Sequence, residues 1–276
     1  MVSVTGRIKQ VRQPRGGYLK VARFDVKSLN DGRVLNKEEN VQSNIIGTVV
    51  DYMTRFMING DKDKAFIISL MGAVYASKVE EVNTYLNQIN GLDDNSIINA
   101  CKAVTFDVWY RKPSDVLLAK GAKDINPDNK TIENIKMMIE RSLKFLEKYG
   151  PIKVDGFTFE GGGYTDTVNT GDGDFLTEDT LWDFKVLRSE PKPKNTLQLL
   201  MYYIMGVHSG KEEFKSIKKI GIYNPRLNKV YQFELKNIPG DVIKEIEENV
   251  ICYKWLHYII KKLHYEFIIK GMISLV

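Results

Sequence analysis

The sequence predicts an α/β fold, in which a central mixed β-sheet is flanked by helices. Helical spacing of apolar residues dominates the first half of the chain, whereas β-rich runs separated by Gly and Asp begin at residue 152. Another apolar helix and a hairpin follow. Because no internal repeat or low-complexity linker divides these segments, we expect a single domain over residues 1–276.

The N-terminal segments differ in their predicted structure. Short alternating runs and turn-forming residues predict a few strands over residues 1–40. Residues 44–58 follow with apolar side chains at Ile46, Val49 and Met53, a spacing that buries one face of a helix.

More helices are expected before the sheet-forming part of the chain. They are predicted over residues 62–110 and 131–149, the second beginning at Thr131 and ending at Gly150. Together they would form a helical insertion of about residues 62–150 on the N-terminal side of the core.

The rest of the chain supplies the core, over about residues 151–240. Its β-rich runs are followed by a helix over residues 195–207 and by a hairpin that turns at residues 224–228. About residues 241–270 have the pattern of a long amphipathic C-terminal helix.

Composition limits the class of protein. The 276 residues are 43% hydrophobic and 27% charged, as in a soluble globular protein, and the net charge of +5 permits a polyanionic partner without requiring one. Two distant cysteines, Cys101 and Cys252, and only three histidines argue against a disulfide framework and against a cysteine or histidine metal site. Because neither a signal peptide nor a membrane span is evident, we expect a cytoplasmic protein.

Residues 171–186, GDGDFLTEDTLWDFKV, carry the candidate chemistry. Asp174 begins a short β run, a polar turn follows, and Asp183 and Lys185 lie on a second run. Strand alternation puts Asp183 and Lys185 on one face, with Phe184 opposite in the core. If the two runs pair as a hairpin, Asp174 meets Asp183 across the strands.

Two carboxylates beside an ammonium group suit phosphodiester hydrolysis. Carboxylate oxygens bind Mg²⁺ or Mn²⁺ and leave metal positions open for water and phosphate. Such a metal lowers the pKa of water and stabilises charge on the phosphorus oxygens. A lysine can orient the attacking water and offset negative charge in the transition state.

At these residues the chain resembles the PD-(D/E)XK nuclease superfamily, in particular its RecB-like branch. The family pattern is an Asp, a short hairpin and then (Asp/Glu)-x-Lys, which is matched by Asp174 and by Asp183-Phe184-Lys185. The proline of the superfamily's name is missing, since Gly173 precedes Asp174.

Two more motifs extend the resemblance. RecB-like members carry Gln-x-x-x-Tyr on the next helix, matched by Gln198 and Tyr202. They also carry an upstream G-T-x-x-H helix, matched by residues 47–51, where Asp51 replaces the family histidine.

The resemblance implies a restriction-endonuclease-like core that cuts nucleic acid, expected to be DNA, with Mg²⁺ or Mn²⁺. The metal would be held by Asp51, Asp174, Asp183 and Phe184, and catalysis would depend on Asp174, Asp183, Lys185, Gln198 and Tyr202.

Other interpretations of these residues stay open. A surface hairpin with solvated charges would give Asp174, Asp183 and Lys185 no function. The apolar neighbours of Asp183 and Lys185 favour burial instead, where charges are costly unless paired or bound to metal. A nucleic-acid-binding or assembly module that kept the fold and lost the chemistry is a second alternative, which the missing histidine permits. Asp51 could be a metal ligand or the partner of a buried basic group.

Overall fold

The computed structural model describes residues 2–253 and has an α/β architecture built on a mixed six-stranded sheet, as the sequence predicts. The strand order is β2-β8-β7-β6-β5-β3. β6 and β7 are parallel, whereas the other neighbouring strands are antiparallel. The strands are β2 (Asp25–Ser28), β3 (Val154–Phe157), β5 (Gly173–Leu176), β6 (Thr180–Phe184), β7 (Lys219–Asn224) and β8 (Lys229–Glu234).

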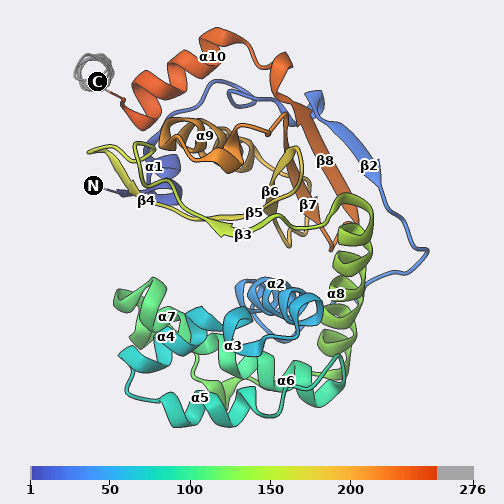
Figure 1. Ribbon diagram of the computed structural model, residues 1–276. Helices are drawn as coiled ribbons and strands as arrows, with labels where there is room; N and C mark the ends of the chain where they lie inside the picture. The colour runs from blue at the N-terminus through green and yellow to red at the C-terminus, as the bar shows by residue number, and fades with distance from the viewer. Residues whose placement is uncertain (1, 254–276) are drawn as a thin grey trace, which may run out of the picture.

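Helices lie on both sides of the sheet (Figure 1). On one side α9 (Pro193–Ser209) packs against β6 and β7, with α1 (Val4–Gln10) beside it. On the other side lie α2 (Ser43–Asn59) and the long α8 (Asn129–Tyr149). The smaller helices near them are α3 (Lys62–Ala65), α4 (Ile67–Tyr75), α5 (Val79–Leu86), α6 (Asp94–Ala103) and α7 (Asp107–Arg111).

Apolar contacts hold β6 on both of its faces. Leu181 belongs to the buried cluster formed with α9, whereas Trp182 belongs to an aromatic cluster with Phe145 of α8. The Phe145 ring stacks on Tyr223 at a centroid distance of 4.0 Å and meets Trp182 edge-on at 4.9 Å. β6 is therefore fixed between α9 and α8, as expected for a buried strand with neighbours on both edges.

The regular periodic segments follow the sequence-based predictions. The predicted helix over residues 44–58 is α2, and the one over residues 195–207 is α9. The hairpin expected around residues 224–228 is formed by β7 and β8. α8 begins two residues before the predicted Thr131, because Asp128 caps the helix by accepting a hydrogen bond from the Thr131 N–H.

The prediction for residues 1–40 is wrong in part. Two short strands are present, β2 and β1 (Val2–Ser3), the latter paired with β4 (Val168–Thr170), but residues 4–10 form the helix α1. The Ser3 side chain caps this helix at the Gly6 N–H, and Val4 and Ile8, four residues apart, are buried on one face. A seven-residue helix is too short to give a strong periodic signal.

The predicted long helix over residues 241–270 is also interrupted within the part that the structure describes. α10 (Gly240–Glu245) passes into a π-helical turn (Ile246–Ile251), and Cys252 then adopts a left-handed conformation with φ of 66°. The remainder of the prediction lies outside the described residues. Between residues 2 and 253, no helix is long and apolar enough to cross a membrane.

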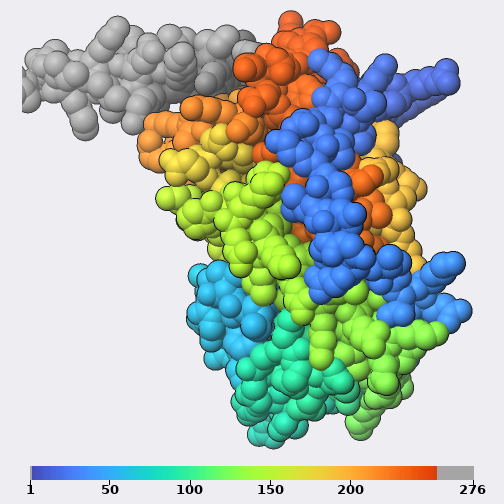
Figure 2. Space-filling view, turned by 90° about the vertical axis from the view of Figure 1, so that its right-hand side faces the viewer, coloured from blue at the N-terminus to red at the C-terminus, as the bar shows by residue number. Residues whose placement is uncertain are grey.

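Residues 29–42, here called the strap, run over the outside of the molecule from β2 to α2 (Figure 2). Near its start, Asp31 accepts hydrogen bonds from Nη2 and Nε of Arg141 on α8, at 2.8 and 3.0 Å. Arg141 is buried and also donates to the carbonyl oxygen of Pro225 in the β7–β8 turn. The strap thus joins α8 to the sheet.

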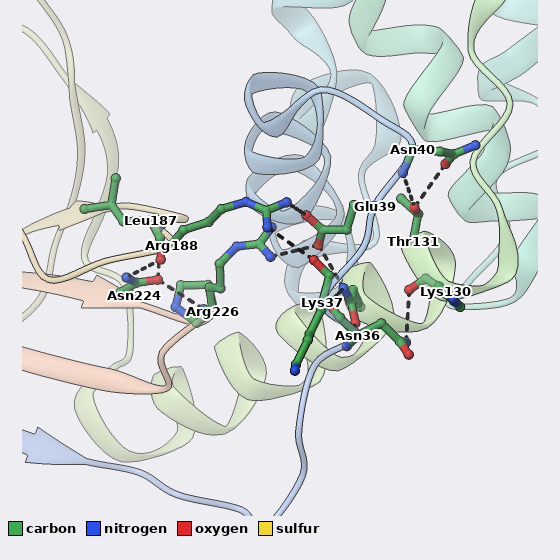
Figure 3. Close-up of polar contacts among 12 residues, drawn as sticks. Asn36, Lys37, Glu39, Asn40, Lys130, Thr131, Leu187, Arg188, Asn224 and Arg226 are labelled. Carbon is green, nitrogen blue, oxygen red and sulfur yellow. Dashed lines mark hydrogen bonds and ion pairs between the residues drawn. The ribbon is translucent and has the colours of Figure 1, made fainter.

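A second cluster of charges fixes the other end of the strap (Figure 3). The Glu39 side chain is fully buried and accepts hydrogen bonds from Arg188 at 2.6 Å and from Arg226 at 2.8 Å. Arg188 follows β6, and Arg226 lies in the β7–β8 turn. The cluster therefore fixes the segment that follows β6.

The Asp31–Arg141 pair predicts a pH-dependent contribution to stability. Hydrogen bonds from Arg141 hold the pKa of Asp31 below its ordinary value. Because a lowered folded-state pKa stabilises the fold above the unfolded pKa, of about 4, the contribution is complete above that pH, declines below it and is lost as the pH falls through the lowered folded-state pKa. We expect Asp31→Asn to lower the free energy of unfolding by about 3 kcal/mol at pH 7 and by about 1 kcal/mol less at pH 3.

Urea unfolding of both proteins at pH 7 and pH 3, followed by circular dichroism, measures this difference. The exposed Asp63→Asn is the control and should change little at either pH. An equal effect of Asp31→Asn at both pH values would contradict the assignment.

Candidate active site

The hairpin of β5 and β6 brings the first two candidate residues together. Phe175 pairs with Trp182 in its register, so the next positions outward are Asp174 and Asp183. Asp174 Oδ2 accepts a hydrogen bond from the main-chain N–H of Phe184 at 2.5 Å. Asp174 therefore reaches across to the end of β6.

The end of β6 carries a buried ion pair. Lys185 Nζ donates to Asp183 Oδ1 at 2.6 Å, which places both side chains on one face of the strand. Asp183 is 1% exposed, and its second oxygen, Oδ2, is buried without a hydrogen-bond partner. Phe184 lies on the opposite face, with its ring 5.9 Å from that of Tyr223. The interpretation of Asp183 as a solvated surface residue is therefore wrong.

The charges in this cluster influence one another strongly. Burial raises the pKa of Asp183 to about 7, with Lys185 acting to lower it and Asp174 to raise it. Burial alone would lower the pKa of Lys185, but the carboxylates of Asp183, Asp174 and Asp51 outweigh burial and raise it. The lysine is thus held as a cation among acidic groups.

α2 adds a second charged group to the site. Arg55 Nε donates to Asp51 Oδ1 at 2.9 Å, Nη1 donates to Asp155 of β3, and Nη2 donates to the carbonyl oxygen of Asp174 at 3.3 Å. Burial raises the pKa of Asp51, Arg55 lowers it, and the charge of Asp174 raises it. Asp51 thus has the basic partner that its place on an apolar helix suggests.

The sequence reasoning missed Arg55. Its signal was its position one helical turn beyond Asp51, which puts the two side chains on the same side of α2. The other partner, Asp155, lies 100 positions further along the chain, so that no local pattern identifies it.

The two candidate residues on α9 contact each other. Gln198 Nε2 donates to the hydroxyl of Tyr202 at 2.7 Å, and both side chains are buried. Burial raises the pKa of Tyr202, and the negative charges of Asp183 and Asp174 add to the rise. Gln198 and Tyr202 thus lie on the α9 side of the acidic cluster, which consists of Asp51, Asp174 and Asp183.

The donor set suits a hard divalent cation. The charge of Asp174 raises the pKa of both Asp51 and Asp183, so the three carboxylates belong to one region. Asp183 also offers an oxygen that has no hydrogen-bond partner. Phe184 enters this region through its main chain, next to Asp174. Within residues 2–253, no three Asp, Glu, His or Cys side chains are grouped so that they could hold a metal ion by themselves. A bound cation would therefore also need water, phosphate or main-chain oxygens.

Comparison of the chain with protein-family models, curated proteins and solved structures finds no match. The function of the chain is therefore inferred from the geometry and chemistry of Asp51, Asp174, Asp183, Lys185 and their neighbours.

The position of Arg55 predicts strong coupling between α2 and the sheet. Arg55→Met leaves Asp51 and Asp155 without their shared cation, so we expect a loss of about 3–5 kcal/mol in the free energy of unfolding. Adding Asp51→Asn removes one of the two stranded charges and should restore part of this loss.

Urea unfolding of the single and double variants gives the coupling energy. Arg12→Met, at an exposed position, serves as the control. Strictly additive losses in the double variant would show that Arg55 and Asp51 do not act as a pair.

Proposed function

We propose that the chain is a metal-dependent nuclease that hydrolyses phosphodiester bonds, with DNA as the expected substrate. One observation carries the proposal. At the end of β6, the buried Asp183 gives one carboxylate oxygen to Lys185 and leaves the other without a partner. A buried polar atom of this kind is costly unless a ligand satisfies it.

Asp183 and Asp174 would hold Mg²⁺ or Mn²⁺, with Asp51 and Phe184 as further candidates. When bound, the cation supplies Lewis-acid stabilisation of the phosphate oxygens and makes a nearby water more acidic. A cation would also offset the two causes that raise the pKa of Asp183, which are its burial and, to a smaller extent, the charge of Asp174.

Lys185 would act on the reacting groups directly. Its ammonium group is held at Asp183, beside the region where the phosphate would lie, and can donate hydrogen bonds to the attacking water or to a phosphate oxygen. Because the phosphate gains negative charge in the transition state, a fixed cation at this point lowers the barrier.

The remaining residues of the site would keep this group in place. Gln198 and Tyr202 would brace the site from α9 or contact the nucleic-acid backbone. Arg55 would hold Asp51 and the main chain of Asp174.

We also propose that the fold contains a restriction-endonuclease-like core. The β5–β6 hairpin, the α9 crossover and the parallel β7 are consistent with a restriction-endonuclease-like core over about residues 151–240. The helices over residues 62–150 would then be an insertion into that core.

Lys185→Ala tests the central claim. The charge of Lys185 is needed mostly in the transition state, so we expect turnover to fall by about 100-fold or more while DNA affinity is nearly unchanged. The variant should still fold, with a lower free energy of unfolding because Asp183 loses its partner. Cleavage of linear and circular, single- and double-stranded DNA in Mg²⁺ or Mn²⁺ is the measurement, with the exposed Lys236→Ala as control.

Full cleavage by a folded Lys185→Ala protein would remove Lys185 from the mechanism. A wild-type protein that binds DNA but cuts none of these substrates in either metal would be the inactive binding module instead.

Asp174→Asn and Asp183→Asn test the metal site. Each exchanges an anionic oxygen ligand for an amide, so the affinity for Mn²⁺ should fall by about tenfold or more. Isothermal titration calorimetry measures this affinity, and Asp63→Asn is the matched control. Unchanged Mn²⁺ binding in both site variants would place the metal elsewhere.

A further inference from the structure

A pocket of about 640 Å³ lies next to the candidate site, between the end of α2, the end of α8 and β3. Its volume falls within the range of about 300–1,000 Å³ typical of small-ligand sites. In Figure 2 the light-blue residues near the end of α2 lie below the yellow-green residues around β3.

One wall of the pocket is shared with the candidate site. Asp155 lines the pocket and accepts a hydrogen bond from Arg55. The same guanidinium group contacts Asp51 and the main chain of Asp174. A ligand in the pocket would therefore lie one side chain away from the acidic cluster.

The apolar part of the pocket offers a contact surface for the ring of a ligand. Leu143, Leu146 and Ile152 contribute to its wall, and Ile58 at the end of α2 is 43% exposed. An apolar side chain left open to water beside a cavity gains stability when a ligand covers it.

The charged part of the pocket places two cations, Lys64 and Lys153, near two acidic residues, Glu147 and Asp155. Lys64 is exposed, and its ammonium group makes no ion pair or hydrogen bond with any residue in the described part of the chain. Among residues 2–253, Lys153 forms an ion pair only with the exposed Glu178, at 3.5 Å. The charge of Asp155 is offset by Arg55, and Glu147 leaves an acceptor for an amino or hydroxyl group. An apolar wall, a cation and an acceptor together match the base, the phosphate and the sugar or base edge of a nucleotide.

We propose that this pocket binds one unpaired nucleotide of the substrate strand, next to the phosphate that is cut. The base would lie against Ile58 and its apolar neighbours, and the phosphate would contact Lys64. A base that stays paired and stacked in a duplex cannot enter such a pocket, so the nucleotide at this position is either single-stranded or flipped out of the duplex. This inference rests on the proposed nuclease function.

The test measures binding without cleavage. A fluorescein-labelled oligodeoxythymidine of about ten nucleotides is titrated with the full-length protein in EDTA, and its anisotropy is followed. Thymidine monophosphate, thymidine and inorganic phosphate are then added as competitors. Ile58→Asp and Lys64→Glu change the apolar and the cationic part of the pocket at exposed positions.

We expect each pocket variant to weaken oligonucleotide binding by about tenfold or more. The matched controls, Val207→Asp on α9 and Lys236→Glu, are also exposed and should stay within about twofold of the wild type. Thymidine monophosphate should compete better than thymidine or phosphate, because only the nucleotide contacts both parts of the pocket.

Pocket variants that bind like their controls would overturn the inference. A wild-type protein that binds neither the labelled oligonucleotide nor thymidine monophosphate would also overturn it. Cleavage by the wild type together with unaffected pocket variants would reject the pocket and keep the nuclease. Pocket-dependent binding without cleavage in Mg²⁺ or Mn²⁺ would keep the pocket and reject the nuclease.

Discussion

The buried ion pair between Asp183 and Lys185 is the interaction on which the candidate site depends. Removing either partner leaves the charge of the other without its counter-ion in a largely buried position, at a cost of several kcal/mol. The pair also leaves Asp183 Oδ2 without a partner, so the fold tolerates a local deficit at this point. The surrounding structure must therefore hold both groups in place. A buried polar atom without a hydrogen-bond partner is characteristic of functional sites.

The sheet provides that support. β6 has β5 on one edge and β7 on the other, and its side chains pack alternately against α9 and α8. Trp182 donates from Nε1 to Thr177 Oγ1 at 3.0 Å, which fixes the hairpin turn. Gly221 is required beneath it, because a Cβ there would lie 2.5 Å from the indole ring. The acidic residues thus sit on rigid strands, where their geometry is well defined.

Sequence patterns predicted the parts of this structure whose signals are local. Apolar periodicity identified α2 and α9, and strand alternation predicted that Asp183 and Lys185 share a face, because each depends on neighbours a few positions away. The contacts of Arg55 with β3 and β5, and of Glu39 with Arg188 and Arg226, were not predictable. Each is an ion pair or hydrogen bond between distant segments, and charged residues of this kind look like ordinary surface residues in a sequence.

The same long-range contacts determine when the site can form. Arg55 and the carbonyl of Asp174 are 119 positions apart, and Glu39 and Arg226 are 187 apart. During synthesis α2 therefore emerges with Asp51 and Arg55 long before their partners exist. Closing such long loops costs entropy that only the completed contacts recover. We expect a partly made chain to carry helices before Asp51, Asp174 and Asp183 come together, because the contacts that hold these residues form only after the strands of the sheet have been made.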